Sequence, residues 1–165
     1  MTTSACEFVL FGPPLAGKST LIETYAENRS LRCESYPFQP LGQSFSERGY
    51  RAVDTDGTIL LATSPGAVWT IGTWNDLLRS ANRIVVVVDP QESRLESNHE
   101  YLSYLGDQRV RIVGLQVTKV DLVGPDRAHA VARELCERFA LNIPSTFGTT
   151  QDPSSVCTLL DRLRS

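Results

Sequence analysis

The sequence contains little lysine, no excess of positive charge and no long apolar run. Lysine occurs only twice, at Lys18 and Lys119, whereas arginine occurs 14 times among the 165 residues. The formal net charge of −3 provides no basic face for nucleic acid, so we expect no nucleic-acid partner. The longest apolar run, Ile84 to Val88, is too short to span a bilayer and predicts no transmembrane segment. The remaining composition is that of an ordinary globular domain.

Paired cysteines and targeting signals are also missing. There is no C-x-x-C pair and no histidine cluster near a cysteine, which argues against a zinc site and a redox dithiol. The first residues carry no signal-peptide pattern, and neither end carries a lipid-attachment motif. We expect a soluble, cytoplasmic protein without a lipid anchor. Reduced thiols are expected at all four cysteines: Cys6, Cys33, Cys136 and Cys157.

Apolar patterning predicts strands that alternate with helices. The dipeptide Asp56-Gly57 predicts a hairpin, and residues 28–49, which lack periodicity, are expected to form a long surface loop. The order indicates an α/β fold over residues 1–165, a single-domain three-layer sandwich with a mostly parallel sheet and one antiparallel hairpin strand. Strands are expected at 6–11, 50–53, 58–63, 84–89, 112–118 and 143–146, and helices at 19–27, 93–105, 126–139 and 154–164.

A phosphate-binding motif lies between the first strand and the first helix. Residues 12–19 read Gly-Pro-Pro-Leu-Ala-Gly-Lys-Ser and match G-x-x-x-x-G-K-[ST] at every fixed position. In such a P-loop, backbone N–H groups surround a phosphate, the lysine neutralises its distal oxygens and the Ser19 hydroxyl binds Mg²⁺. The prolines lack N–H groups, so the donors are expected from the later half of the loop. The candidate phosphate-binding residues are Gly12, Leu15, Ala16, Gly17, Lys18, Ser19 and Thr20.

A second motif follows the strand predicted at 112–118. Thr118-Lys119-Val120-Asp121 fits [NT]-K-x-D and contains the second lysine. A carboxylate at this position can accept two hydrogen bonds from the N1–H and N2–H₂ edge of guanine, whereas adenine offers no such pair of donors. A buried charge without its partner is costly, so the selectivity can be steep. The candidate guanine-binding residues are Thr118, Lys119 and Asp121.

The order of P-loop, long loop, hairpin, Pro-Gly turn and T-K-x-D resembles the small GTPases of the Ras superfamily over nearly the whole chain. The bacterial MglA-type polarity GTPases are the most similar, because they carry Thr-x-Pro-Gly where most relatives have Asp-x-x-Gly, and residues 63–66 read Thr-Ser-Pro-Gly. This resemblance implies that Gly66 contacts the γ-phosphate and that Thr63 touches a water bound to Mg²⁺.

The resemblance also implies further site residues. The segment that backs the guanine corresponds to Thr149 and Thr150, and the Mg²⁺ ligand of the first switch segment to Ser44 or Ser46. Ala67 stands where most relatives have the glutamine that orients the attacking water, so intrinsic hydrolysis should be slow. Besides Gly66, the candidates for stabilising charge on the γ-phosphate are Arg48 and Arg51.

The sequence therefore predicts a P-loop NTPase that switches between GTP-bound and GDP-bound states with Mg²⁺. The resemblance implies a role in cell polarity or motility and a roadblock-type activator protein as partner. One alternative is a degenerate nucleotide-binding module with little or no hydrolysis. A small-molecule P-loop kinase is disfavoured, because no arginine-rich insertion is present to close over the donor phosphates.

Overall fold

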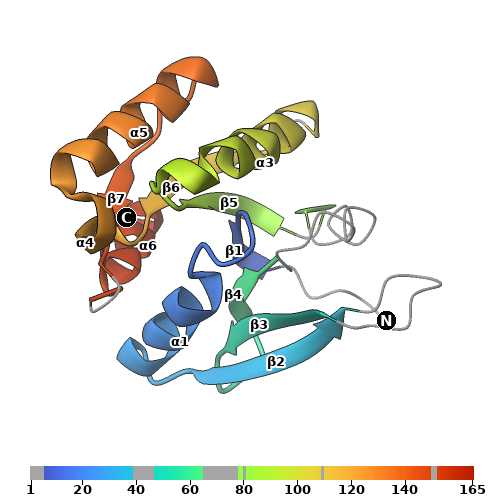
Figure 1. Ribbon diagram of the computed structural model, residues 1–165. Coiled ribbons are helices and arrows are strands. Elements are labelled where there is room, and N and C mark those ends of the chain that lie inside the picture. The colour runs from blue at the N-terminus through green and yellow to red at the C-terminus, as the bar shows by residue number, and fades with distance from the viewer. Residues whose placement is uncertain (1–5, 39–46, 65–77, 80, 109, 150–151) are drawn as a thin grey trace.

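A seven-stranded sheet with the order β2-β3-β4-β1-β5-β6-β7 forms the centre of the protein (Figure 1). The structure is a computed structural model that describes residues 6–38, 47–64, 78–79, 81–108, 110–149 and 152–165. The strands are β1 (Cys6–Phe11), β2 (Arg32–Phe38), β3 (Glu47–Val53), β4 (Ile59–Thr63), β5 (Ala81–Val88), β6 (Ile112–Val117) and β7 (Ser145–Phe147). The helices are α1 (Lys18–Asn28), the 3₁₀ turn η2 (Glu92–Arg94), α3 (Leu95–Asp107), α4 (Val120–Val123), α5 (Pro125–Arg138) and α6 (Ser155–Arg164).

Only β3 runs against its neighbours in this sheet. It pairs antiparallel with both β2 and β4, whereas β4, β1, β5, β6 and β7 pair in parallel. The hairpin around Asp56-Gly57 joins β3 to β4, and the Asp54 amide donates to the Thr58 carbonyl across it at 2.9 Å. The predicted fold class, a mostly parallel α/β sheet with one antiparallel hairpin strand, is confirmed.

Helices cover both faces of the sheet, which makes the three layers (Figure 1). Side chains of β1 alternate between the two faces, as strand geometry requires. Phe8 and Leu10 pack with α1 and α6, whereas Val9 and Phe11 pack with α3 and α5. The central strands are therefore buried on both faces, which explains why β1 and β5 read as continuous apolar runs. None of the helices in the described ranges combines the length and apolar character needed to cross a membrane.

The expected surface loop over residues 28–49 is wrong, because this segment contains β2 and the start of β3. Every residue of β2 pairs with β3, from Arg32 opposite Val53 to Phe38 opposite Glu47. This strand lies at the edge of the sheet, and its described side chains are exposed or half-buried. A strand without a buried face has no alternating apolar pattern, so its sequence looks like that of a loop. The Arg51 guanidinium bonds the Glu34 carboxylate at 2.9 Å across the pair.

Two smaller differences lie near the end of the chain. The last strand covers Ser145–Phe147 and not 143–146, so Phe147 is part of the sheet. The short helix α4 directly follows the T-K motif and has no counterpart among the expected elements. Helices α3, α5 and α6 begin and end within two residues of the predicted bounds.

The sheet also decides which cysteine can react in the native protein. Burial raises the pKa of the Cys6 thiol to about 12, whereas Cys33 is exposed on β2. Because the thiolate is the nucleophile, Cys6 should be alkylated last and Cys33 first when the native protein meets iodoacetamide at pH 8. Peptide mass spectrometry at timed intervals measures the order. Labelling of Cys6 as fast as Cys33 would contradict the burial of β1.

Candidate functional site

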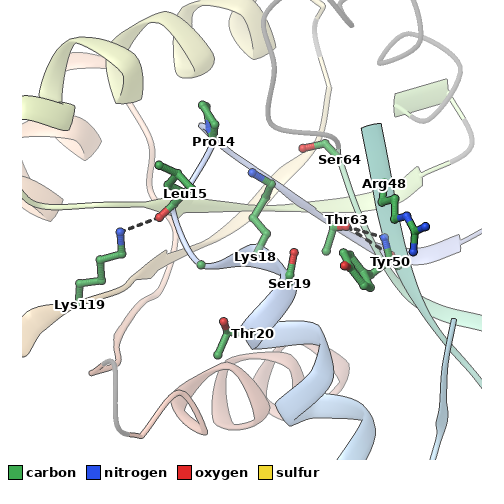
Figure 2. Close-up of a pocket in the computed structure, with 11 residues that line it drawn as sticks. Pro14, Leu15, Lys18, Ser19, Thr20, Arg48, Tyr50, Thr63, Ser64 and Lys119 are labelled. Carbon is green, nitrogen blue, oxygen red and sulfur yellow. Dashed lines mark hydrogen bonds between the residues drawn. The ribbon is translucent and has the colours of Figure 1, made fainter. Parts of the chain in front are cut away.

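A pocket of about 590 Å³ opens where the P-loop, the start of α1, the end of β4 and the loop after β6 meet (Figure 2). Three cationic side chains line it, Lys18, Arg48 and Lys119, and no carboxylate is among its described lining residues. Both lysines of the chain are thus at this one pocket, in a protein whose net charge is negative. Such a pocket attracts an anion. Its lining residues are Pro14, Leu15, Gly17, Lys18, Ser19, Thr20, Arg48, Tyr50, Thr63, Ser64 and Lys119.

The P-loop backbone has the shape of an anion cradle. Leu15 and Gly17 both adopt left-handed conformations, with φ of 62° and 92°. Left-handed residues that alternate with ordinary ones turn successive N–H groups to the same side, and such a concavity binds phosphate. Gly12 has a different role, because a Cβ atom there would lie 2.2 Å from the Val87 carbonyl oxygen. Only glycine allows the loop to start this close to β5.

Lys18 and the start of α1 supply positive charge to the cradle. The Lys18 side chain is 7% exposed, and its ammonium donates to the carbonyls of Gly12 and Pro13, both at 2.7 Å. Ser19 and Thr20 are exposed in the first turn of α1. That turn contains no acidic residue, so its free N–H groups face the pocket without a competing carboxylate.

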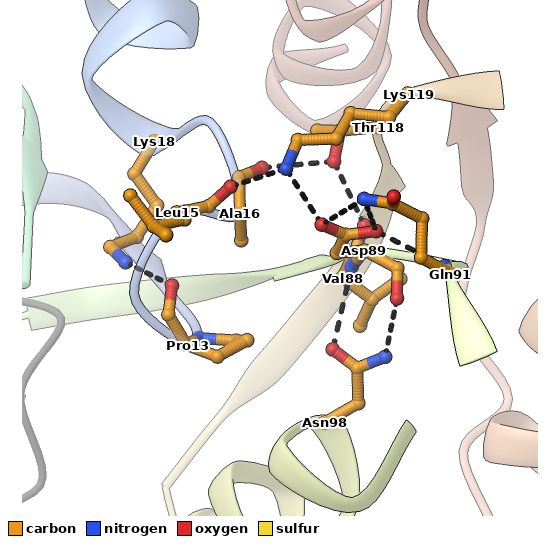
Figure 3. Close-up of polar contacts among 10 residues, drawn as sticks. All are labelled: Pro13, Leu15, Ala16, Lys18, Val88, Asp89, Gln91, Asn98, Thr118 and Lys119. Carbon is orange, nitrogen blue, oxygen red and sulfur yellow. Dashed lines mark hydrogen bonds and ion pairs between the residues drawn. The ribbon is translucent and has the colours of Figure 1, made fainter. Parts of the chain in front are cut away.

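Thr118 holds the P-loop from the other side. Its hydroxyl donates to the Ala16 carbonyl at 2.9 Å and is also 3.1 Å from the Val88 carbonyl (Figure 3). The side chain is 6% exposed. This contact joins residues 102 positions apart in the sequence, so the loop after β6 fixes the backbone of the phosphate cradle.

Lys119 makes a second connection between the same two loops. It is left-handed, with φ of 54°, and its ammonium donates to the Leu15 carbonyl at 2.6 Å and to the Asp89 carboxylate at 2.7 Å (Figure 3). Asp89 is 1% exposed at the end of β5, where Gln91 donates to its carboxylate and Asn98 donates to its carbonyl. The buried carboxylate is therefore paired, as its burial requires. Sequence reasoning missed Asp89, whose only signal was an acidic residue after an apolar run.

Two further guanine candidates, Asp121 and Thr149, follow β6 and β7. Asp121 is exposed in the first turn of α4, and the Val120 amide donates to the Gly148 carbonyl at 3.1 Å. Thr149 follows directly, with its amide donating to the Asp152 carbonyl and its hydroxyl accepting from the Asp152 amide. The structure thus brings the T-K-x-D motif beside Thr149.

A buried polar network behind these loops was not foreseen. Gln116 is fully buried in β6, where it donates to the Ser155 hydroxyl at 2.7 Å and accepts from the Thr146 hydroxyl at 2.6 Å. It therefore links β6, β7 and α6. A Cβ atom on Gly148 would lie 2.6 Å from the Ser155 hydroxyl, so only a glycine at this position lets the loop pass so close to the network. A glutamine inside an apolar strand was the sequence signal for this network.

Thr63, the candidate contact to a water on Mg²⁺, forms hydrogen bonds with two tyrosines. It is 2% exposed, and its hydroxyl accepts from the Tyr50 amide at 2.9 Å. The Tyr36 hydroxyl on β2 donates to the Thr63 carbonyl at 2.8 Å, and burial raises the pKa of that tyrosine. The end of β4 is thus held by residues of the two outer strands, β2 and β3, and the role of Thr63 toward the metal stays a prediction.

The two candidate arginines differ in position. Arg48 lines the pocket (Figure 2). Arg51 instead bonds Glu34 through two of its nitrogens, both at 2.9 Å, with its guanidinium 5.9 Å from the centre of the Tyr36 ring. These contacts direct Arg51 along the outer strands, so Arg48 is the better placed of the two.

Other predicted site residues lie outside the described residues: Ser44, Ser46, Gly66 and Thr150.

The sequence of the chain matches the model of a GTPase family. The model of a family described as 50S ribosome-binding GTPase matches residues 7–119 of this chain. The chain belongs to this GTPase family. Its P-loop, its cationic pocket and the start of the T-K-x-D motif all lie within the matched span, and the protein is a GTP-binding P-loop domain. No curated protein matches the GTPase.

Two solved structures with the same fold are elongation factors. A bacterial selenocysteine-specific elongation factor EF-Sec matches with 19% identity and a TM-score of 0.61, over 94% of this chain and 29% of that one. The elongation factor SelB from Methanococcus maripaludis, in complex with the GTP analogue GppNHp, matches with 16% identity and a TM-score of 0.66, over 99% of this chain and 34% of that one. The GTPase thus spans about a third of their length or less, and this likeness shows the fold alone.

The contacts of Thr118 and Lys119 with the P-loop predict that a substitution in the loop after β6 changes the affinity for nucleotide. Thr118→Val keeps the shape of the side chain but removes the donor to the Ala16 carbonyl, and loss of one buried hydrogen bond should weaken GDP binding about tenfold. Calorimetric titration of the GTPase measures the change. Thr158→Val, at an exposed position on α6, is the matched control and should bind like the wild type. Unchanged affinity in Thr118→Val would show that the connection does not shape the cradle.

Proposed function

We propose that this GTPase is a guanine-nucleotide switch, in which the residues 12–20 hold the phosphates and the T-K-x-D motif holds the base. One observation supports this most strongly. The Lys119 ammonium contacts the Leu15 carbonyl at 2.6 Å, so the motif expected to bind guanine touches the loop expected to bind phosphate. A nucleotide that spans both loops would meet groups already fixed relative to each other, which lowers the cost of binding.

The phosphates would bind in the P-loop cradle. The later backbone N–H groups, from Leu15 to Thr20, would donate to the phosphate oxygens, and the Lys18 ammonium would neutralise the distal ones. That ammonium already lies against two carbonyls at the loop entrance, so it needs little reorganisation. The helix N-terminus adds partial positive charge beneath.

The base would bind between the T-K-x-D motif and the loop after β7. Asp121 would accept the two guanine donors, the stem of Lys119 would lie along the ring, and Thr118 would hold the P-loop in place. Thr149 and Thr150 would back the base. The fixed contact of Val120 with Gly148 keeps these two loops together and supports this arrangement.

The pocket residues also fit Mg²⁺. Within the described ranges no group of three or more acidic, histidine or cysteine side chains could hold a metal, so the ion would need oxygens from the nucleotide as well. Ser19 would be the protein ligand, with Thr63 acting through a water and Ser44 or Ser46 as a further ligand. Bound Mg²⁺ supplies charge neutralisation between the phosphates.

Hydrolysis by this chain alone is expected to be slow. Phosphoryl transfer depends on positioning and charge stabilisation, and Ala67 has no group that could orient the attacking water. Arg48 would stabilise charge on the γ-phosphate from β3, and Gly66 would contact the same phosphate.

The likeness of residues 63–66 to the MglA-type polarity GTPases suggests a Ras-like switch in cell polarity or motility. A roadblock-type activator protein would be the partner and would supply the missing group that orients the attacking water.

Base specificity tests the guanine assignment. GTP should outcompete ATP by orders of magnitude, and Asp121→Asn should weaken GTP binding about a hundredfold, because the amide no longer matches both guanine donors. The same variant should gain affinity for xanthosine triphosphate, whose additional carbonyl can accept from the amide. Competition titrations with a fluorescent nucleotide measure both. Asp126→Asn, in the first turn of α5, is the control. ATP competing as well as GTP against the wild type would refute the assignment.

Single-turnover GTP hydrolysis tests the catalytic assignment. Arg48→Ala should slow hydrolysis about tenfold or more, because a cation facing the developing charge is lost. Arg51→Ala removes the same side chain three residues along the strand, where Glu34 already pairs it, and should change the rate little. Ala67→Gln should raise the rate. Rapid hydrolysis by the wild type alone would show that another residue positions the water, and no turnover in any variant would favour the degenerate module.

A further inference from the structure

Ser64 is a buried hydroxyl that the assigned roles leave unused. The residue is 2% exposed directly after β4, and its Oγ has no hydrogen-bond partner among the residues that the structure describes. Its amide donates to the Leu10 carbonyl at 3.0 Å, so the backbone at this position is fixed against β1. A buried hydroxyl without a partner costs stability, and native proteins rarely keep one without a reason.

The hydroxyl lies at the anion pocket. Ser64 is one of its lining residues, and Figure 2 shows the oxygen turned toward the side of the pocket where the Lys18 ammonium lies. The neighbouring hydroxyl, that of Thr63, already bonds the Tyr50 backbone. Of these two hydroxyls at the end of β4, the one on Ser64 therefore has its hydrogen available to donate to a ligand in the pocket.

We propose that the Ser64 hydroxyl donates a hydrogen bond to the terminal phosphate of a bound nucleoside triphosphate. The lysine of a P-loop reaches the β- and γ-phosphates, so a hydroxyl facing that ammonium meets the distal end of the nucleotide. A diphosphate does not extend to this point. Ser64 thus discriminates the triphosphate from the diphosphate. In the sequence it directly precedes Pro65-Gly66. This inference rests on the proposed nucleotide function and adds a contact to it.

Ser64→Ala tests the contact through binding and stability, without reliance on turnover. The variant should bind a non-hydrolysable GTP analogue about tenfold more weakly, the usual effect of one lost hydrogen bond, and GDP like the wild type. The nucleotide-free variant should melt at the wild-type temperature or higher, because no hydrogen bond among the described residues is lost. Titration calorimetry and thermal unfolding measure the two quantities.

Ser155→Ala is the matched control, since that hydroxyl accepts from Gln116 and has a structural partner. It should lower the melting temperature and should not separate the analogue from GDP. Equal binding changes for both nucleotides in Ser64→Ala, no change for either, or a lower melting temperature would each overturn the proposal. Failure of the wild type to bind either nucleotide would instead refute the proposed function, and the role of Ser64 with it.

Discussion

The contact between the Lys119 ammonium and the Leu15 carbonyl joins the loop after β6 to the P-loop, and the position of the T-K-x-D motif at the pocket depends on it. Lys119 reaches that carbonyl from a left-handed backbone position, and the buried Asp89 carboxylate fixes the other side of its ammonium. Thr118 adds a parallel connection to Ala16. Because β1 and β6 both pair with β5, their carboxyl ends meet at one edge, and two loops about 100 residues apart can share these bonds.

The outer strands hold the opposite wall of the pocket. Strand β2 was not expected, yet its Tyr36 hydroxyl bonds the Thr63 carbonyl, and β3 bonds the Thr63 hydroxyl through Tyr50. The end of β4 is therefore fixed by contacts within the protein. A nucleotide-dependent movement of this wall would have to break these hydrogen bonds. Strands β2 and β3 would therefore take part in the proposed switch.

Sequence reasoning predicted those parts that depend on local pattern. The P-loop has fixed residue spacing, and the buried strands have unbroken apolar runs, so both were found with nearly correct bounds. Strand β2 was missed because an edge strand with charged side chains lacks such a pattern. The pairing of Asp89 with Lys119 and the network of Gln116 were missed for another reason, since both join residues 30 or more positions apart. The choice of Arg48 over Arg51 likewise needed the neighbouring strand that holds Arg51.

The nucleotide that accompanies the purified protein tests the central claim most directly. The protein is purified without added nucleotide, denatured, and the released small molecules are separated by chromatography. GDP or GTP in stoichiometric amount is the predicted result, with none from Lys18→Ala, whose cradle has lost its main cation. Adenine nucleotides in their place, or equal amounts of guanine nucleotide from both proteins, would contradict the assignment of this pocket as a guanine-nucleotide site.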